Sequence, residues 1–231
     1  MRKDSVNIRA QEDKLFEYWR QKPGRTPFVI DGAPFPDLYE KSLPRTLFIL
    51  KDCNLGNYDC QVFRLREQME NNPSTWWSTV ANWGQLLRNL TGNEPTWNEV
   101  ISAPIQRGLE RHTYMQLKKK PGGGRISDAE LWRYTKEDSE EIRKQIRIYS
   151  PHIIVAAGTG RYVKHILNCS DEMKKTPRGI GYWAASKQAD SACYIIDFCH
   201  PSNRAGLKVS SALGYGLRDA CIYLEELRQI A

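Results

Sequence analysis

Four short apolar runs recur along the chain, separated by longer segments of mixed polarity. They begin near Thr46, Thr113, His152 and Tyr194. Runs of this length, rich in β-branched and aromatic residues, are typical of strands buried on both faces. Because helical segments separate them, the pattern predicts an α/β fold: a three-layer α/β/α sandwich with a central, mostly parallel, four-stranded sheet.

Apolar residues at helical spacing fill the segments between these runs. The predicted helices extend from about Ile8 to Gln21, Cys60 to Glu70, Thr75 to Leu90, Lys136 to Tyr149, Arg161 to Leu167 and Ser210 to Ile230. A further helix is expected to start at Ser127. The tryptophans at 76, 77 and 83 are expected in the core, because buried packing is a commoner role for tryptophan than stacking on a base. Gly158 and Gly160 predict a tight turn from strand to helix, since the third glycine of a dinucleotide-binding fingerprint is missing.

Size and charge limit the kinds of protein that this chain can be. At 231 residues it is long enough for one substantial core, so residues 1–231 are expected to form a single domain. The formal net charge of +7 favours polyanionic partners, because cationic side chains bind phosphates and release counterions. None of the six cysteines forms a Cys-x-x-Cys pair, so no zinc or iron–sulfur framework and no cofactor is expected. With no recognisable signal peptide or membrane span, a cytoplasmic protein is expected.

Polar residues follow the first apolar run directly. Leu47 to Leu50 has the character of a buried strand, and Asp52, Asn54 and Gly56 come next. Ligands of open parallel sheets bind outside the carboxyl ends of the strands, so Asp52 and Asn54 are expected at the mouth of a crevice. The alternative is a buried strand followed by an ordinary turn that Asp52 caps.

The last apolar run also ends in polar residues. After Tyr194 to Phe198 the sequence continues Cys199-His200-Pro201-Ser202-Asn203-Arg204. An imidazole, a hydroxyl, an amide and a guanidinium thus follow one strand. Two strand ends are therefore predicted to carry the chemistry of one site.

The two segments together resemble the uracil-DNA glycosylase superfamily. Asp52-Cys53-Asn54-Leu55-Gly56 is similar to the Gly-Met-Asn-Pro-Gly form of the first motif in the mismatch-specific and single-strand-selective branches. His200-Pro201-Ser202 matches the second motif directly. The resemblance implies a monomeric, monofunctional DNA glycosylase that hydrolyses the N-glycosidic bond of a flipped pyrimidine nucleotide.

The resemblance also implies roles for the residues of both motifs. Asn54 would position the attacking water, and His200 would stabilise the departing base oxygen. Because an amide is a poor base, the carboxylate of Asp52 is the candidate for taking the proton of that water. Three further roles are implied. Ser202, with Asn203 next to it, would bind a flanking phosphate, and Arg204 or Leu207 would fill the place that the flipped base leaves in the stack. Gln116 would read the base edge, where the superfamily has an asparagine.

A lysine-rich segment follows the second apolar run. Lys118, Lys119 and Lys120 precede Pro121 and three glycines, and Arg125 comes next. A lysine run is usually a solvated surface turn. The functional interpretation is a flexible loop that clamps DNA phosphates, because glycines allow close backbone approach and lysines supply charge.

The prediction about the substrate rests on Gly56. Uracil-specific members of the superfamily have a tyrosine at this position, whose ring excludes pyrimidines with a 5-substituent. Gly56 leaves that wall open, unless Tyr58 replaces the ring, so a 5-modified pyrimidine is expected: a mismatched thymine or a hypermodified cytosine of phage DNA. The enzyme would then act in base-excision repair or in antiviral defence. Two alternatives stay open: an inactive DNA-binding protein of the same fold, and a small-molecule nucleosidase.

Overall fold

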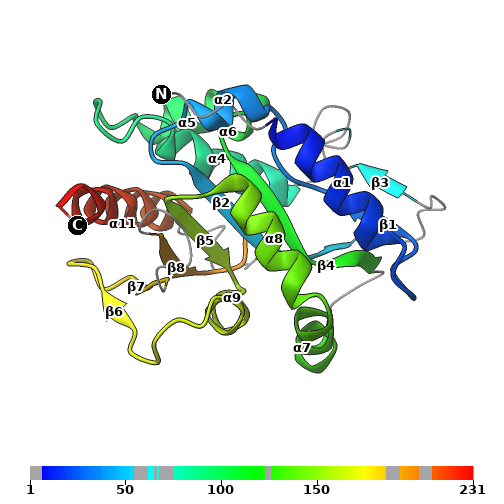
Figure 1. Cartoon of the computed structure of the whole chain (residues 1–231). Helices are drawn as coiled ribbons and strands as arrows, with labels where there is room; N and C mark the ends of the chain where they lie inside the picture. The colour runs from blue at the N-terminus through cyan, green and yellow to red at the C-terminus, as the bar shows by residue number, and fades with distance from the viewer. Residues whose placement is uncertain are drawn as a thin grey trace, which may run out of the picture.

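The chain forms an α/β fold in which helices flank a mixed sheet (Figure 1). The structure is a computed structural model, and it describes residues 7–54, 62–64, 67, 75–122, 126–185, 193–202 and 210–230. The sheet has six strands in the order β4-β2-β5-β8-β7-β6. The α/β class and the mostly parallel core are therefore confirmed, and the predicted number of four strands was too low.

The four predicted strands form the parallel part of the sheet. They are β2 (Thr46–Asn54), β4 (Thr113–Gly122), β5 (Ile153–Ala157) and β8 (Tyr194–Phe198). The two strands that the apolar pattern missed are β7 (Gly181–Ala184) and β6 (Lys174–Lys175), both antiparallel. They are too short for an apolar run, and β6 consists of two lysines, so only pairing with the neighbouring strand defines them.

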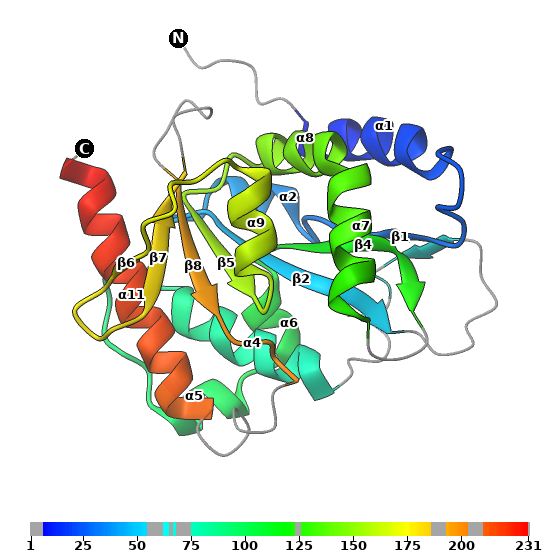
Figure 2. The same ribbon diagram turned by 90° about the horizontal axis from the view of Figure 1, so that it is seen from below.

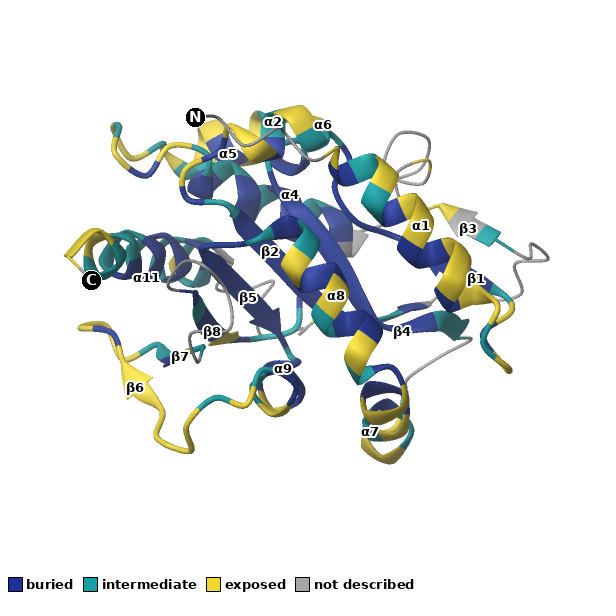
Figure 3. Cartoon of the chain, in the orientation of Figure 1, coloured by how far each residue is buried: buried dark blue, intermediate teal, exposed yellow. Residues whose placement is uncertain are grey.

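β2 lies in the middle of the parallel core. It pairs with β4 on one side, where Leu50 lies opposite Gln116, and with β5 on the other, where Ile49 lies opposite Ala156. Figure 3 shows β2 and β5 as buried over most of their length. A strand with neighbours on both edges and helices over both faces must be apolar, which explains the run from Leu47 to Leu50.

Helices cover both faces of the sheet (Figure 2). On one face the core includes side chains from α4 (Thr75–Leu87), α6 (Ile105–Leu109) and α11 (Ser210–Ile230), with α5 (Trp97–Ser102) beside α4. On the other it includes side chains from α1 (Ile8–Arg20), α2 (Pro36–Glu40), α7 (Asp128–Glu137), α8 (Ser139–Tyr149) and α9 (Gly160–Ile166). The three predicted layers are present.

Two local predictions from the sequence are confirmed, the start of α7 and the burial of two tryptophans. Ser127 accepts a hydrogen bond from the Glu130 backbone and begins α7, as predicted. Trp77 and Trp83 are buried in the core between α4 and the sheet, also as predicted. The side chain of Trp76 lies outside the described residues.

A separate two-stranded sheet corrects one helix prediction. β1 (Phe28–Ile30) pairs in parallel with β3 (Val62–Arg64), so Phe28 lies opposite Val62. The predicted helix from Cys60 to Glu70 is therefore wrong at residues 62–64. A short Val-Phe-Arg segment suits either structure, and its pairing with β1 makes it a strand.

In the part of the chain that the structure describes, every helix is too short or too polar to cross a lipid bilayer.

Candidate functional site

Three parallel strands end close together at the carboxyl edge of the sheet. β2 carries Lys51 and Asp52 in its last four residues, β5 runs into Gly158, and β8 leads to His200. Gly158 has φ +71°, and a Cβ built on it would lie 3.0 Å from the Cβ of His200 and 3.4 Å from the Cε of Lys51. Both side chains thus pack over one glycine, which makes the tight turn predicted from the sequence.

His200 is held as a neutral hydrogen-bond donor. The backbone N–H of Ser202 donates to His200 Nδ1 at 3.2 Å, and the Ser202 hydroxyl lies 2.8 Å from the same nitrogen. Nδ1 is therefore an acceptor, and the proton of the neutral ring belongs on Nε2. Burial, reinforced by the charge of Lys51, lowers the pKa of His200 to about 4. At neutral pH the ring can donate from Nε2 without carrying a charge.

Asp52 provides a carboxylate at the same edge. Burial raises the pKa of Asp52, and the charge of Lys118, whose Nζ lies 4.0 Å from Oδ2, opposes that shift. Its buried Oδ2 has no hydrogen-bond partner among the described residues. A Cβ on Gly122 would lie 2.7 Å from Oδ2, so a side chain at this position would displace the carboxylate. An ionised Asp52 has a free lone pair with which to accept a proton.

Gln116 carries a buried amide without a partner. Its residue exposure is 0%, and neither Nε2 nor Oε1 has a hydrogen-bond partner within the described part of the chain. Side chains alternate along β4, so Gln116 lies on the opposite face of the sheet from Met115 and Leu117, which pack with the α1 and α8 side. An unpaired buried amide is costly, and a ligand edge with donors and acceptors would satisfy it.

The predicted lysine loop is a strand instead. β4 continues through Gly122, which places Lys118, Lys119 and Lys120 within the sheet. Lys119 is fully buried and forms an ion pair with Asp31, so its prediction as a phosphate contact is wrong. A buried ammonium needs a carboxylate partner, and Asp31 supplies it.

The other two lysines differ in exposure. Lys118 is almost completely buried and lies 3.0 Å from Glu130, above the ring of Tyr134, so it is not free to clamp a phosphate. Lys120 is partly exposed and keeps its predicted role as a hypothesis.

Several predicted site residues lie outside the described residues. These are Gly56, Tyr58, Arg125, Asn203, Arg204 and Leu207. Asn54 is described by its backbone alone, which pairs with Gly122 at the end of β2. Ser202 is exposed beside His200. The structure therefore brings Asp52 and His200 to one sheet edge, with Gln116 deeper on β4, and shows nothing of the predicted wedge.

Lys51 is the residue that the sequence interpretation missed. The signal was the interruption of an apolar run by a cation directly before Asp52. Lys51 and His200 both approach Gly158 from segments far apart in the chain, so the sequence alone did not indicate this arrangement.

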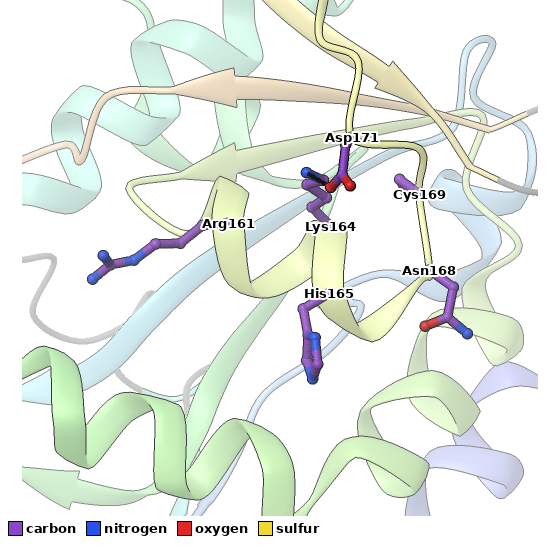
Figure 4. A pocket seen from close by; sticks show the side chains of 6 residues that line it. All are labelled: Arg161, Lys164, His165, Asn168, Cys169 and Asp171. Carbon is purple, nitrogen blue, oxygen red and sulfur yellow. Dashed lines mark hydrogen bonds and ion pairs between the residues drawn. The ribbon is translucent and has the colours of Figure 1, made fainter.

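Two surface pockets lie away from this edge. One, with a volume of about 310 Å³, lies against α9 and the segment after it (Figure 4). Lys164 and Asp171 form a 2.7 Å ion pair there, whereas Arg161 and His165 point elsewhere, so the polar groups do not converge. The other, of about 280 Å³, lies between α1 and β3.

Comparison with models of known protein families and with curated proteins found no match.

Proposed function

We propose that this chain is a monofunctional DNA glycosylase. The observation that supports it best is the arrangement of His200, a neutral Nε2–H donor, at the same sheet edge as the carboxylate of Asp52. In the motif resemblance to the uracil-DNA glycosylase superfamily, His200 begins the second motif, whereas Asp52 takes the place of the first glycine of the first motif, two residues before Asn54. Neutral donors that are already oriented stabilise developing negative charge without losing energy to reorganisation.

The proposed reaction begins with a pyrimidine nucleotide flipped out of the duplex. Water adds to C1′ of the sugar and gives its proton to Asp52, while Asn54 orients that water. The bond between C1′ and the base nitrogen breaks, and its electron pair leaves with the base. His200 donates from Nε2 to the base oxygen on which negative charge develops.

Gln116 is proposed to read the flipped base. Its amide offers two donors and one acceptor, all without a partner among the described residues, and can be oriented toward either a cytosine or a uracil edge. The substrate class rests on Gly56, which leaves space at the 5-position. We therefore propose a 5-modified pyrimidine as substrate, in repair or in defence against phage DNA.

DNA is the proposed partner, and the net charge of +7 supports it. Lys120 and Ser202 are the described candidates for phosphate contacts, and Arg125, Asn203, Arg204 and Leu207 are proposed for the remaining contacts. The protein is proposed to act in the cytoplasm as a monomer, without a cofactor.

The test is base release from defined duplexes. Purified protein is incubated with oligonucleotides that carry uracil, mismatched thymine or a 5-substituted cytosine at one position, and abasic sites are revealed by alkaline strand cleavage. We expect release of a 5-substituted base. Tight binding without release would favour the inactive DNA-binding alternative, and release from free nucleosides alone would favour the nucleosidase.

A further inference from the structure

Lys51 is a partly buried cation without an ion-pair partner. No carboxylate of the described residues lies within 4.0 Å of its ammonium, whereas buried Lys118 and exposed Arg161 near this sheet edge are both paired. Its Cε lies beside Gly158, against which His200 also packs. The side chain therefore extends along the end of β5 toward the segment that carries His200.

The charged groups around Lys51 leave its charge available. Asp52, the nearest carboxylate in sequence, lies beside Lys118. Asp128 is paired with Arg161 at 2.5 Å. Lys51 lowers the pKa of His200, Asp52 and Asp128, which agrees with a position among all three. Among the described residues, the other charged groups near this edge are Glu130 of α7, Lys120 of β4, and Asp197 of β8, which faces Gly160.

We propose that Lys51 is a catalytic residue that stabilises the departing base anion together with His200. The inference rests on the proposed glycosylase function and adds a residue to it. As the bond from C1′ to the base nitrogen breaks, the electron pair goes to the base. His200 meets the base oxygen with a neutral donor, and Lys51 supplies the full positive charge that the neutral ring lacks. The ammonium keeps its protons, and the released anion is protonated by solvent.

A backbone phosphate is the other anion that Lys51 could meet. The packing favours the base anion as the partner of Lys51. Lys51 lies beside Gly158, as His200 does, and not beside the candidate phosphate contacts, exposed Ser202 and half-exposed Lys120. A cation in a partly desolvated position also acts more strongly on charge that appears in the transition state than on a phosphate already in solvent.

The experiment is a leaving-group series on Lys51 variants. Lys51→Met, Lys51→Arg and a matched control, Lys14→Met on the exposed surface of α1, are assayed in single turnover at saturating enzyme. The duplexes carry bases whose N1 acidity differs. We expect Lys51→Met to slow cleavage by about 10-fold to 100-fold, with a larger loss for the poorer leaving groups. Lys51→Arg should recover much of the rate, and Lys14→Met should match the wild type.

Binding and NMR measurements separate the other outcomes. An equal loss for all leaving groups, or weaker DNA binding with an unchanged saturated rate, would overturn the proposal, and the second result would assign Lys51 to a phosphate. The titration of the His200 ring in free protein should shift to a higher pH in Lys51→Met. If the wild type releases no base from any duplex, the proposed function itself fails, and the His200 titration then reports only the electrostatic effect of Lys51 on that ring.

Discussion

At the scale of single residues, the site depends on how the chain fixes one imidazole. Ser202 assigns the tautomer of His200 through its backbone N–H, so no side chain other than the ring is needed for that step. Gly158 gives His200 its place at the end of β5. The sequence indicated His200 and Asp52 because both follow apolar runs directly.

His200→Ala should lower single-turnover cleavage by roughly 10²-fold, the usual loss of one oriented donor to developing charge. DNA affinity should change little, because the donor acts on charge that is absent from the bound ground state. His165→Ala provides a control, since that ring lies exposed on α9 against Trp132. A His200 variant that cleaves like the wild type would remove this residue from the mechanism.

Gly158→Ala should damage both stability and activity. Its φ of +71° disfavours any side chain, and the added Cβ would come within 3.0 Å of His200. Gly24→Ala is a matched control, because Gly24 has φ +73° and nothing within 4 Å of the added atom. Urea unfolding should show a loss of about 1 kcal/mol from the backbone in both variants, and cleavage should fall in Gly158→Ala alone. Equal cleavage in the two variants would show that His200 tolerates the shift.

At the scale of elements, α1, α8, β1 and β4 share a buried polar network. Asp31, which follows β1, accepts hydrogen bonds from Lys119 and Gln145, and Gln145 leads through Tyr149 to Glu12. No sequence pattern indicated this network, because its members come from four separate segments. This network explains why Lys119, one of the three lysines predicted to contact phosphate, lies wholly inside the protein.

Lys119→Met should therefore act on folding. Removing one member of a buried ion pair typically costs about 3–5 kcal/mol, because it leaves the other charge unpaired. Lys120→Ala is the counterpart on the same strand: we expect unchanged stability and a salt slope of DNA binding reduced by about 1. Urea unfolding and binding at several salt concentrations measure the two effects. A stable Lys119 variant with a reduced salt slope would restore the predicted phosphate clamp.

Glu12 should make stability depend on pH. Burial, opposed by the Ala33 backbone and by Arg9, raises its pKa from 4.5 to about 7. A carboxyl group whose pKa is raised by folding contributes its full stabilisation of the folded state below its unfolded pKa. For Glu12 this contribution is lost as the pH rises from 4.5 through its folded pKa of about 7. The whole effect is at most about 3 kcal/mol.

Glu12→Gln isolates this contribution. His112, His152 and His200, with pKa values lowered to about 4, act in the opposite direction as pH falls through the same range. The variant keeps those histidines, so the difference between wild type and variant in urea unfolding at pH 5 and pH 8 should report Glu12 alone. We expect the variant to gain stability relative to the wild type at pH 8. An unchanged difference at the two pH values would contradict the raised pKa.

At the scale of the whole molecule, the layered fold was predictable because four apolar runs are long enough to identify as buried strands. β3, β6 and β7 were not, since strands of two to four residues are defined by the neighbour with which they pair. The same limit applies to the site. Residues that follow a strand are visible in the sequence, whereas the approach of Lys51 and His200 to Gly158 and the pairing of Lys119 with Asp31 depend on which strands become neighbours.

The outer strand β6 has a consequence for how the molecule behaves at high concentration. An open sheet edge invites the strands of other copies to add to it, and two exposed lysines there repel such an approach. Replacing Lys174 and Lys175 with valine should leave base release unchanged and should promote light-scattering aggregates on mild heating. The two exposed lysines are therefore expected to oppose edge-to-edge pairing between copies of the chain, an effect separate from the proposed catalysis.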